Sequence, residues 1–428
     1  MHKTPLRAPR ARVTFGCGIV AAMAAALVAC GGGGAAGEGP SGAGAVDLSA
    51  PAPGGAPAGN DAASAPAPPE HPANDTPVVS TREAPQLGGC ELFPPEAVFN
   101  TRIDDPQRFP AHPRSAAWIA SIGVNTPFRA DWWRGEDPDR LDSYFGMPIN
   151  VLDGQPHSTD WAVLQYDFRP SGVSSEVGWP HESDCAVASG NGFDLVRGCS
   201  AVPAPARLFP FPKEAPKHGG GNCNDPNRCG DHHLLVLEQN ACRLWEAYFP
   251  YKLDGQWYGL ATAGWDLNSL SMRPDTWTAA GAAALPIAPF IAKVAEADTG
   301  EIRHALRVTF RDAVLSRGYD WPARHGAGGD TPGGIPFGAV LRLRADFPIP
   351  EHWGTHAKAI ATAAKRYGLY VHDIGEDLYV PGEPSAGWDP ALFGQLSTIP
   401  LSQLEFVDLG AITRDPRFSV DSMAASWR

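Results

Sequence analysis

Two histidines and two glutamates lie in two short apolar runs near the middle of the chain. The runs are Gly230–Glu238 and Cys242–Phe249, and their alternating pattern around a short polar connection predicts a β-hairpin. Because side chains alternate across a strand, His232 and His233 point to opposite faces. His233 and Glu246 share a face only if the register of the two strands permits it. Histidine transfers protons near neutral pH, so this hairpin is the first candidate for chemistry.

A pair of carboxylates could support glycoside hydrolysis, which needs two carboxyl groups roughly 5 to 10 Å apart. We expect this pair to be Glu246 and Asp266, because each lies among aromatic or apolar residues, and partial burial raises a carboxyl pKa. Trp245 and Tyr248 are the aromatic residues expected to bind substrate. The alternative for Asp266 is structural, since Asp-Leu-Asn-Ser is also typical of a turn.

A second group of residues is suited to binding an anion. His304 and Arg307 are expected on one strand, and Arg324 directly precedes His325. Arginine binds a carboxylate with two parallel hydrogen bonds, and histidine can remove a proton. With Tyr248 or Tyr319 as the acid, this group would suit β-elimination of a uronate polymer. The alternative is that these arginines cover strand edges or pair with surface acids.

No metal site is predicted, although three patterns resemble one in part. The loop Asn222–Asp231 is rich in oxygen ligands and could hold Ca²⁺, but a turn closed by a disulfide is the alternative. Cys223 and Cys229 are spaced too far apart for the usual zinc pattern. His352 and His356 have the spacing of a helical metal pair but lack a third ligand. The sequence contains no H-E-x-x-H, G-x-S-x-G or P-loop motif.

Eight cysteines are present, and their number indicates disulfides. Cys17 lies in the N-terminal apolar segment and Cys30 at its end, which leaves six. An even number of cysteines in an exported domain is typical of a disulfide framework. Fifteen pairings of six cysteines are possible. We favour two local loops and one long closure, namely Cys185–Cys199, Cys223–Cys229 and Cys90–Cys242.

The N-terminus has the features of a signal peptide, predicted over residues 1–29. Basic residues and no acid precede an apolar run that is shorter than the roughly 20 residues of a membrane span. The run ends Leu27-Val28-Ala29-Cys30, which resembles the lipobox of bacterial lipoproteins. The resemblance implies that Cys30 is diacylated (palmitate among the acyl chains). Gly31 replaces the aspartate that retains lipoproteins in the inner membrane, so an outer-membrane location is implied, with the domain facing the periplasm or the cell surface.

The chain after the lipobox divides into three further segments. Residues 30–89 are rich in Gly, Ala, Pro and Ser and predict a disordered tether, because they cannot bury enough apolar surface to fold. Residues 90–410 are expected to form one globular domain. Residues 411–428 are polar and predict a frayed tail. The formal net charge of -13 argues against nucleic acid as a partner.

The globular region predicts a mainly β fold, an antiparallel sandwich or jelly roll with one or two appended helices. Short strand-like runs alternate with turn residues at Trp161–Phe168, His233–Leu237, Arg243–Phe249, Ala305–Phe310 and Ala339–Ala345. The clearest helix is Gly354–Tyr367, which Gly368 ends. A shorter helix is expected from about Thr276. Leu369–Val371 and Leu378–Val380 predict a strand pair.

Several short elements resemble a group of uncharacterised exported bacterial proteins. The likeness covers about residues 230–380 and implies one intact domain, but it implies no activity. The elements that carry it are Asp231–His233, Cys242–Glu246, Gly264–Ser269, Leu285–Ile287, Gly300–Arg307, Trp321–His325 and Lys365–Gly368.

Two functions from different classes follow from these observations. The first is an enzyme that acts on a polysaccharide, as a hydrolase or a lyase, with five catalytic residues in one cleft: Glu246, Asp266, His233, His304 and His325. The second is a lipoprotein without catalytic activity that binds a glycan or a cell-envelope partner. The enzyme requires that at least two of these five side chains converge in a cleft.

Overall fold

The computed structural model describes residues 83–130, 132, 146–152, 161–190, 192–211, 224–227 and 231–427. These residues belong to one compact unit that begins at residue 78. The mainly β prediction is confirmed, because most of the regular elements are strands and the helices are few and short. The predicted signal peptide, Cys30, most of the tether, Cys223 and Cys229 lie outside the described residues.

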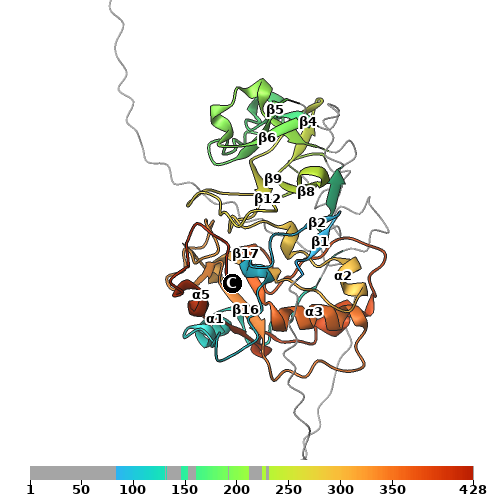
Figure 1. The fold of residues 1–428 in the computed structure, drawn as a ribbon, viewed down its shortest axis with the longest axis vertical. Coiled ribbons are helices and arrows are strands. Elements are labelled where there is room, and N and C mark those ends of the chain that lie inside the picture. Colours follow the sequence, from blue (N-terminus) through green and yellow to red (C-terminus); the bar gives the residue numbers. More distant parts are fainter. Residues whose placement is uncertain are drawn as a thin grey trace, which may run out of the picture. The chain divides into compact units, whose positions relative to one another are not determined.

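The predicted hairpin is present and forms the centre of a four-stranded sheet. Strand β8 (His233–Glu238) pairs antiparallel with β9 (Arg243–Tyr248). β12 (Ala261–Asp266) follows on the β9 side, and β3 (Ile149–Leu152) pairs with β8 in parallel. Both faces of β8 and most of β9 are buried. Figure 1 shows β8, β9 and β12 between the region of β4–β6 and the region of β16 and β17.

Strand alternation explains why the hairpin can be apolar on both faces. Leu235, Leu237 and Leu244 point into the larger hydrophobic core. Leu234, Val236, Trp245 and Ala247 point into a second core on the other side. The sheet therefore lies between two cores in a sandwich-like arrangement, and each face of the hairpin has its own packing partners.

The second core is covered by a six-stranded sheet. Its order is β10 (Tyr251–Leu253), β11 (Gln256–Tyr258), β4 (Trp161–Gln165), β7 (Leu208–Pro210), β5 (Asp184–Ser189) and β6 (Gly192–Arg197). Only the β11–β4 pair is parallel.

The larger core is formed with a second four-stranded sheet. Its order is β13 (Leu306–Phe310), β17 (Leu369–Ile374), β16 (Val340–Leu343) and β18 (Leu404–Phe406), and only β13 and β17 are parallel. Two small sheets complete the described strands. They are β1 (Gln86–Leu87) with β2 (Cys90–Glu91), and β14 (Leu315–Tyr319) with β15 (Ile335–Phe337).

The predicted long helix is confirmed as α3 (Thr355–Arg366), which packs against β16. Alanines make up most of its buried face, together with His356 and Ile360, and Gly368 follows its end with a φ of +83°. A side chain at 368 would crowd Ile103 and Val340, so glycine suits this position both by conformation and by space. The other described helices are α1 (Ser115–Ile122), α2 (Val294–Asp298), α4 (Ala391–Leu396) and α5 (Gly410–Thr413).

Three local predictions are wrong. No helix starts near Thr276, and residues 276–287 are turns and loops in which Gly281 lies against His372. Leu378–Val380 does not pair with β17, which pairs with β13 and β16, and Tyr379 instead bridges to Thr309 and to Arg129. The segment after residue 411 does not fray. It bridges back through Ser422 and Ala424 and buries Met423 and Ala425, because these apolar residues fill the larger core.

Two of the three favoured disulfides are formed. Cys90 and Cys242 are bonded with 5.4 Å between their Cα atoms, and Cys185 and Cys199 with 5.7 Å. The first bond joins β2 to the end of the connection between β8 and β9. The start of the described domain is therefore attached covalently to its central sheet.

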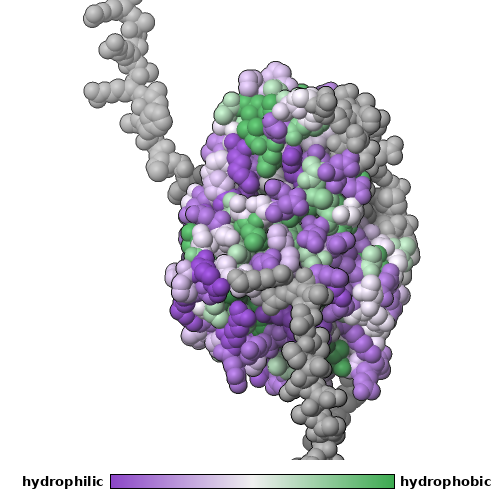
Figure 2. Space-filling model, viewed as in Figure 1, coloured by the Kyte–Doolittle hydropathy of each residue, from purple (hydrophilic) through white to green (hydrophobic). Residues whose placement is uncertain are grey.

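The surface mixes polar and apolar residues, and Figure 2 shows hydrophobic patches separated by hydrophilic side chains on one face. Among the residues described, no helix combines the length and the apolar character needed to cross a membrane. The large apolar side chains that are exposed are Val124, Val151, Val173, Val177, Trp179, Ile374 and Val420.

Candidate functional site

The hairpin register places His233 and Glu246 on the same face. His233 pairs with Tyr248, and Leu235 pairs with Glu246, so His233 and Glu246 both point toward the larger core. His233 is buried, and its Nε2 lies 3.0 Å from the carbonyl oxygen of Ala280. The imidazole thus connects the hairpin to the loop that follows β12.

Glu246 is fully buried and tightly held. Its Oε1 accepts hydrogen bonds from the backbone N–H groups of Ile287 (2.6 Å) and Ala288 (3.0 Å), and its Oε2 accepts one from Trp265 Nε1 (3.2 Å). Burial raises the pKa of Glu246 to about 7, although these hydrogen bonds and the charge of Arg307 oppose the shift. The expected raised pKa is present, but the side chain is closed off from solvent.

Asp266 cannot act together with Glu246. In β12, Asp266 pairs with Arg243 and Ala263 pairs with Glu246, so the two carboxylates lie on opposite faces of the sheet. Asp266 is exposed, and its Oδ1 accepts the backbone N–H of Asn268 at 3.0 Å. The turn alternative therefore describes Asp266, and the predicted carboxylate pair is wrong.

His304 belongs to a buried ion-pair network instead of a cleft. Its Nδ1 donates to the carbonyl oxygen of Ala305 (2.7 Å), and its Nε2 lies 2.9 Å from Oε2 of Glu296. Lys293 Nζ lies 3.5 Å from the same carboxylate oxygen. Burial raises the pKa of Glu296, but Lys293 and His304 outweigh burial and hold the pKa at about 2. This network attaches α2 to the start of β13.

The four residues expected to bind an anion bind to protein groups. Arg307 is buried and donates to Asp373 Oδ2 at 3.1 Å. Arg324 donates to Asp421 Oδ1 at 2.8 Å and thereby holds the C-terminal segment. His325 Nδ1 lies 2.9 Å from the carbonyl oxygen of Ala282. Together with His304, these side chains are spread over separate networks, and the predicted anion site is not assembled.

The two expected aromatic contacts are also structural. Trp245 is fully buried and donates from Nε1 to Oε2 of Glu238 at 2.9 Å. Its ring packs edge-on against Trp161 in the second core. Tyr248 is half-buried and donates its hydroxyl to Asp231 Oδ1 at 2.8 Å. Neither side chain forms a flat exposed platform for a sugar.

The proposed calcium loop is described only at residues 224–227 and at Asp231. Asn224 accepts the backbone N–H of Lys252 (3.0 Å), and Asp225 accepts that of Asn227 (3.0 Å). His356, from the weighed histidine pair, contacts Asp298 at 2.8 Å. Within the described ranges, no three His, Cys, Asp or Glu side chains are grouped so that they could hold a metal ion.

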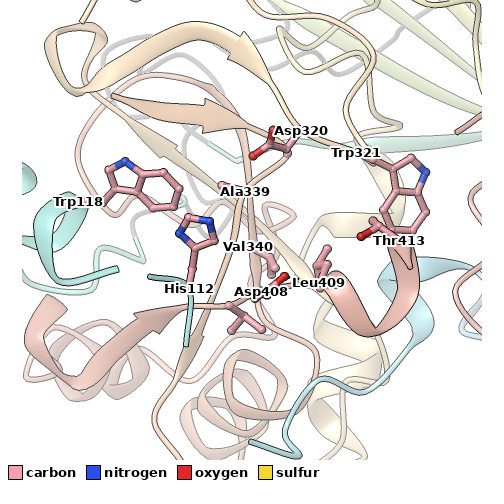
Figure 3. Close-up of a pocket in the computed structure, with 12 residues that line it drawn as sticks. His112, Trp118, Asp320, Trp321, Ala339, Val340, Asp408, Leu409 and Thr413 are labelled. Atoms are coloured by element: carbon pink, nitrogen blue, oxygen red, sulfur yellow. Dashed lines mark hydrogen bonds between the residues drawn. The ribbon is translucent and has the colours of Figure 1, made fainter. Parts of the chain in front are cut away.

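A cavity of about 240 Å³ lies elsewhere, and none of the predicted catalytic residues lines it. It is formed where the segment before α1, the end of β14, the region of β15 and β16, and α5 meet (Figure 3). Residues from four distant parts of the chain line it, namely His112, Trp118, Asp320, Trp321, Gly338, Ala339, Val340, Val407, Asp408, Leu409, Gly410 and Thr413.

His112 is held firmly in this cavity. Its ring stacks on Trp118 with 4.5 Å between ring centroids and 8° between the planes, and its Nδ1 accepts the backbone N–H of Arg114 at 3.2 Å. Partial burial lowers the pKa of His112, while Asp408 and Asp320 oppose the shift. The imidazole is therefore mainly neutral at neutral pH, with Nε2 as the nitrogen that carries the proton.

Two carboxylates accompany His112. Partial desolvation by its neighbours raises the pKa of Asp320, and the nearby His112 opposes the shift. Asp408 Oδ1 accepts the backbone N–H of Gly410 at 2.6 Å, and Oδ2 lies 3.8 Å from Arg414. Figure 3 shows Asp320 and Asp408 on opposite sides of the cavity with His112 beside them.

Gly338 allows the backbone of Asp320 to pack directly against it. It has a φ of +82°, and a Cβ at this position would collide with the carbonyl oxygen of Asp320 and crowd Ala323. Only glycine adopts this conformation without strain. The backbone at 338 thus brings β15 and β16 close to the Asp320 segment.

Trp321 forms the opposite wall from His112. A cis peptide bond joins it to Pro322. Its Nε1 donates to the carbonyl oxygen of Ser422 at 3.0 Å, and its ring meets Phe418 edge-on at 5.1 Å. The C-terminal segment, which was expected to fray, therefore supports a wall of the cavity.

The sequence patterns did not indicate His112, Asp320 or Asp408 as site residues. Asp320 directly precedes one of the elements that carry the resemblance, Trp321–His325, and this was the available signal. His112 and Asp408 belong to no recognisable motif. Their association arises only because long-range packing joins these segments.

The cavity combines two carboxylates, a neutral imidazole and an indole wall, which can accept sugar hydroxyl groups and exchange protons. In comparisons with protein-family models, with curated proteins and with solved structures, we found no match to this chain.

Proposed function

We propose that this protein is a lipoprotein of the outer membrane, facing the periplasm or the cell surface, whose folded domain hydrolyses a polysaccharide in the cavity around His112. The lipobox at Leu27–Cys30 supports the location, and the Gly/Ala/Pro-rich segment after it supports a tether. We assign the catalytic roles to Asp320 and Asp408 in place of Glu246 and Asp266. Glu246 is buried away from solvent, and Asp266 lies on the opposite face of the sheet from Glu246.

The observation that carries the proposal is the pair of carboxylates across one cavity. Asp320 has a raised pKa and serves as the general acid. Asp408 is held by the Gly410 N–H through Oδ1, and its Oδ2, which lies 3.8 Å from Arg414, acts as the base toward a water molecule. His112 lies beside both carboxylates and donates a hydrogen bond from Nε2 to the sugar.

The reaction balances with one water molecule. Protonated Asp320 gives its proton to the glycosidic oxygen while the bond between that oxygen and C1 breaks. Asp408 takes a proton from the water, and the water oxygen forms a new bond to C1. One glycosidic bond and one water are consumed, two sugar products form, and solvent returns the proton from Asp408 to Asp320.

Charge favours hydrolysis over elimination. A uronate residue would bring its carboxylate close to Asp320 and Asp408, and like charges repel. The two arginines expected from the sequence to bind a uronate, Arg307 and Arg324, do not line the cavity and are paired with Asp373 and Asp421. The substrate is therefore a polysaccharide without uronate at the cleaved position.

A polysaccharide panel tests the proposal directly. Hydrolysis yields new reducing ends without absorbance at 235 nm, whereas elimination yields both. We expect reducing ends from at least one neutral polysaccharide and their loss in Asp320→Asn and Asp408→Asn. Asp194→Asn, which removes an exposed carboxylate on β6, is the control and should cleave as the wild type does. Activity that survives in both cavity variants would rule out this mechanism.

A glycan-binding protein without catalysis is the second candidate. The indole wall of Trp321 and the carboxylates suit recognition of sugar hydroxyls even if no bond is cleaved. In that case the wild type retains a polysaccharide in a pull-down, the Asp320→Asn variant binds it less well, and no product forms. This outcome would show that the domain binds a polysaccharide without hydrolysing it.

A further inference from the structure

We infer, resting on the proposed hydrolysis, that the cavity accepts one sugar residue at the non-reducing end of a chain and releases monosaccharides. Its volume of about 240 Å³ is below the range of roughly 300–1,000 Å³ that is usual for pockets of larger ligands. One pyranose ring fits such a space, whereas a chain that continues in both directions does not.

Two firmly supported walls enclose the cavity from opposite sides. On one side, Trp118 donates from Nε1 to the carbonyl oxygen of Gly333 at 3.2 Å and carries the stacked ring of His112. On the other side, Trp321 is held by Ser422, and Thr413 of α5 lies next to it (Figure 3). Because both walls are anchored to the backbone, the width of the cavity between them is fixed.

The floor of the cavity is also closed. Val340 of β16, Val407 and Leu409 line it, and all three side chains are buried. These apolar groups belong to the larger core, so the cavity does not continue through the domain. A sugar residue enters from the solvent side, and the rest of the chain remains outside.

The exposure of the two carboxylates indicates which end of the polysaccharide enters the cavity. Asp320 is only partly desolvated by its neighbours and is the more exposed of the two carboxylates, so it lies nearer the mouth, whereas Asp408 is half-buried. The acid protonates the oxygen that leaves with the outer part of the chain. The water activated by Asp408 attacks C1 of the enclosed residue. The enclosed residue thus supplies C1 of the cleaved bond, which makes it the non-reducing end.

Hexasaccharides labelled with a fluorophore at the reducing end test the inference. The probes are the gluco-oligosaccharides with β-1,4, β-1,3 and α-1,4 linkages and the N-acetylglucosamine hexamer. We expect the labelled pentamer as the first product, with unlabelled monosaccharide in equal amount. Labelled dimers or trimers at the earliest times overturn the inference but not the hydrolysis. Cleavage of none of the probes, together with no product in the polysaccharide panel, overturns both.

A variant that narrows the cavity provides a second measurement. Thr413 lines the cavity and is exposed in α5, so Thr413→Trp adds bulk without disturbing the core. We expect monosaccharide release to fall at least about tenfold, because misplaced reacting groups lose rate steeply. Thr355→Trp, at an exposed site in the first turn of α3, is the matched control and should retain the wild-type rate. Unchanged release by Thr413→Trp contradicts the assignment of the cavity.

Discussion

The buried carboxyl of Glu246 should make the stability of the domain depend on pH, and Glu246→Gln should remove that dependence. In the folded chain its pKa is raised from 4.5 to about 7 by burial. The folded state therefore binds the proton more tightly than the unfolded state does. The stabilisation is fully present below about pH 4.5 and is lost as the pH rises through about 7.

The magnitude follows from the shift. The rise from 4.5 to about 7 corresponds to about 3 kcal/mol in the free energy of unfolding. Most of this change falls between pH 5 and pH 8. Glutamine keeps an oxygen for the N–H groups of Ile287 and Ala288, but its amide nitrogen faces the Trp265 Nε1–H. That conflict costs about 1–3 kcal/mol at every pH, so the slope is the informative quantity.

Urea denaturation at several pH values between 5 and 8, with the disulfides intact, measures this slope. We expect the difference in unfolding free energy between wild type and Glu246→Gln to change by about 2–3 kcal/mol over this range, with the wild type losing stability as the pH rises. Asp266→Asn controls for the removal of one negative charge. Parallel curves for the wild type and Glu246→Gln would falsify the reasoning.

Four further outcomes are expected. Glu296 has a lowered pKa of about 2, so its ion pairs stabilise the fold above about pH 4.5 and are lost toward pH 2. In Glu296→Gln, the free energy of unfolding measured by denaturation should therefore fall less between pH 4.5 and pH 2 than in the wild type. Removing the Cys90–Cys242 disulfide, which spans 152 residues, should lower the free energy of unfolding by about 5 kcal/mol, and an unchanged urea midpoint would contradict this. Gly338→Ala should destabilise by about 1–3 kcal/mol because the residue has a positive φ, whereas Gly394→Ala in α4, where a Cβ meets nothing within 4 Å, should not destabilise. Hydrolysis should decline as the pH rises through the raised pKa of Asp320, and a pH–rate profile with no such limb would remove this residue as the acid.

The periodicity of apolar residues was sufficient to predict the hairpin of β8 and β9 and the helix α3. The hairpin of β8 and β9 and the helix α3 are formed by continuous segments whose apolar residues repeat with the period of the element. The Cys90–Cys242 and Cys185–Cys199 bonds were inferred from count and spacing. The alternation rule also placed His233 and Glu246 correctly once the register was known.

The site could not be predicted because it depends on contacts between distant segments. Asp266 was a plausible partner of Glu246 until the pairing of β12 with β9 placed it opposite Arg243. His112 and Asp408 meet only because the segments before α1 and after β18 pack together, where Ala111 bridges to Val407. No periodic pattern encodes such a contact. The C-terminal segment was likewise misjudged, since its few apolar residues fill a core formed by other parts of the chain.

The bond between Cys90 and Cys242 also sets the mechanical path through the domain. A pull on the chain at Glu83 first reaches β1 and β2, which are short and can peel apart. At Cys90 the load passes directly to Cys242, at the start of β9. The load then enters the central sheet beside the ladder of β8 and β9, which has six residue pairs. A pull from the N-terminal side therefore reaches the central sheet through a covalent bond, without first unfolding residues 91–241.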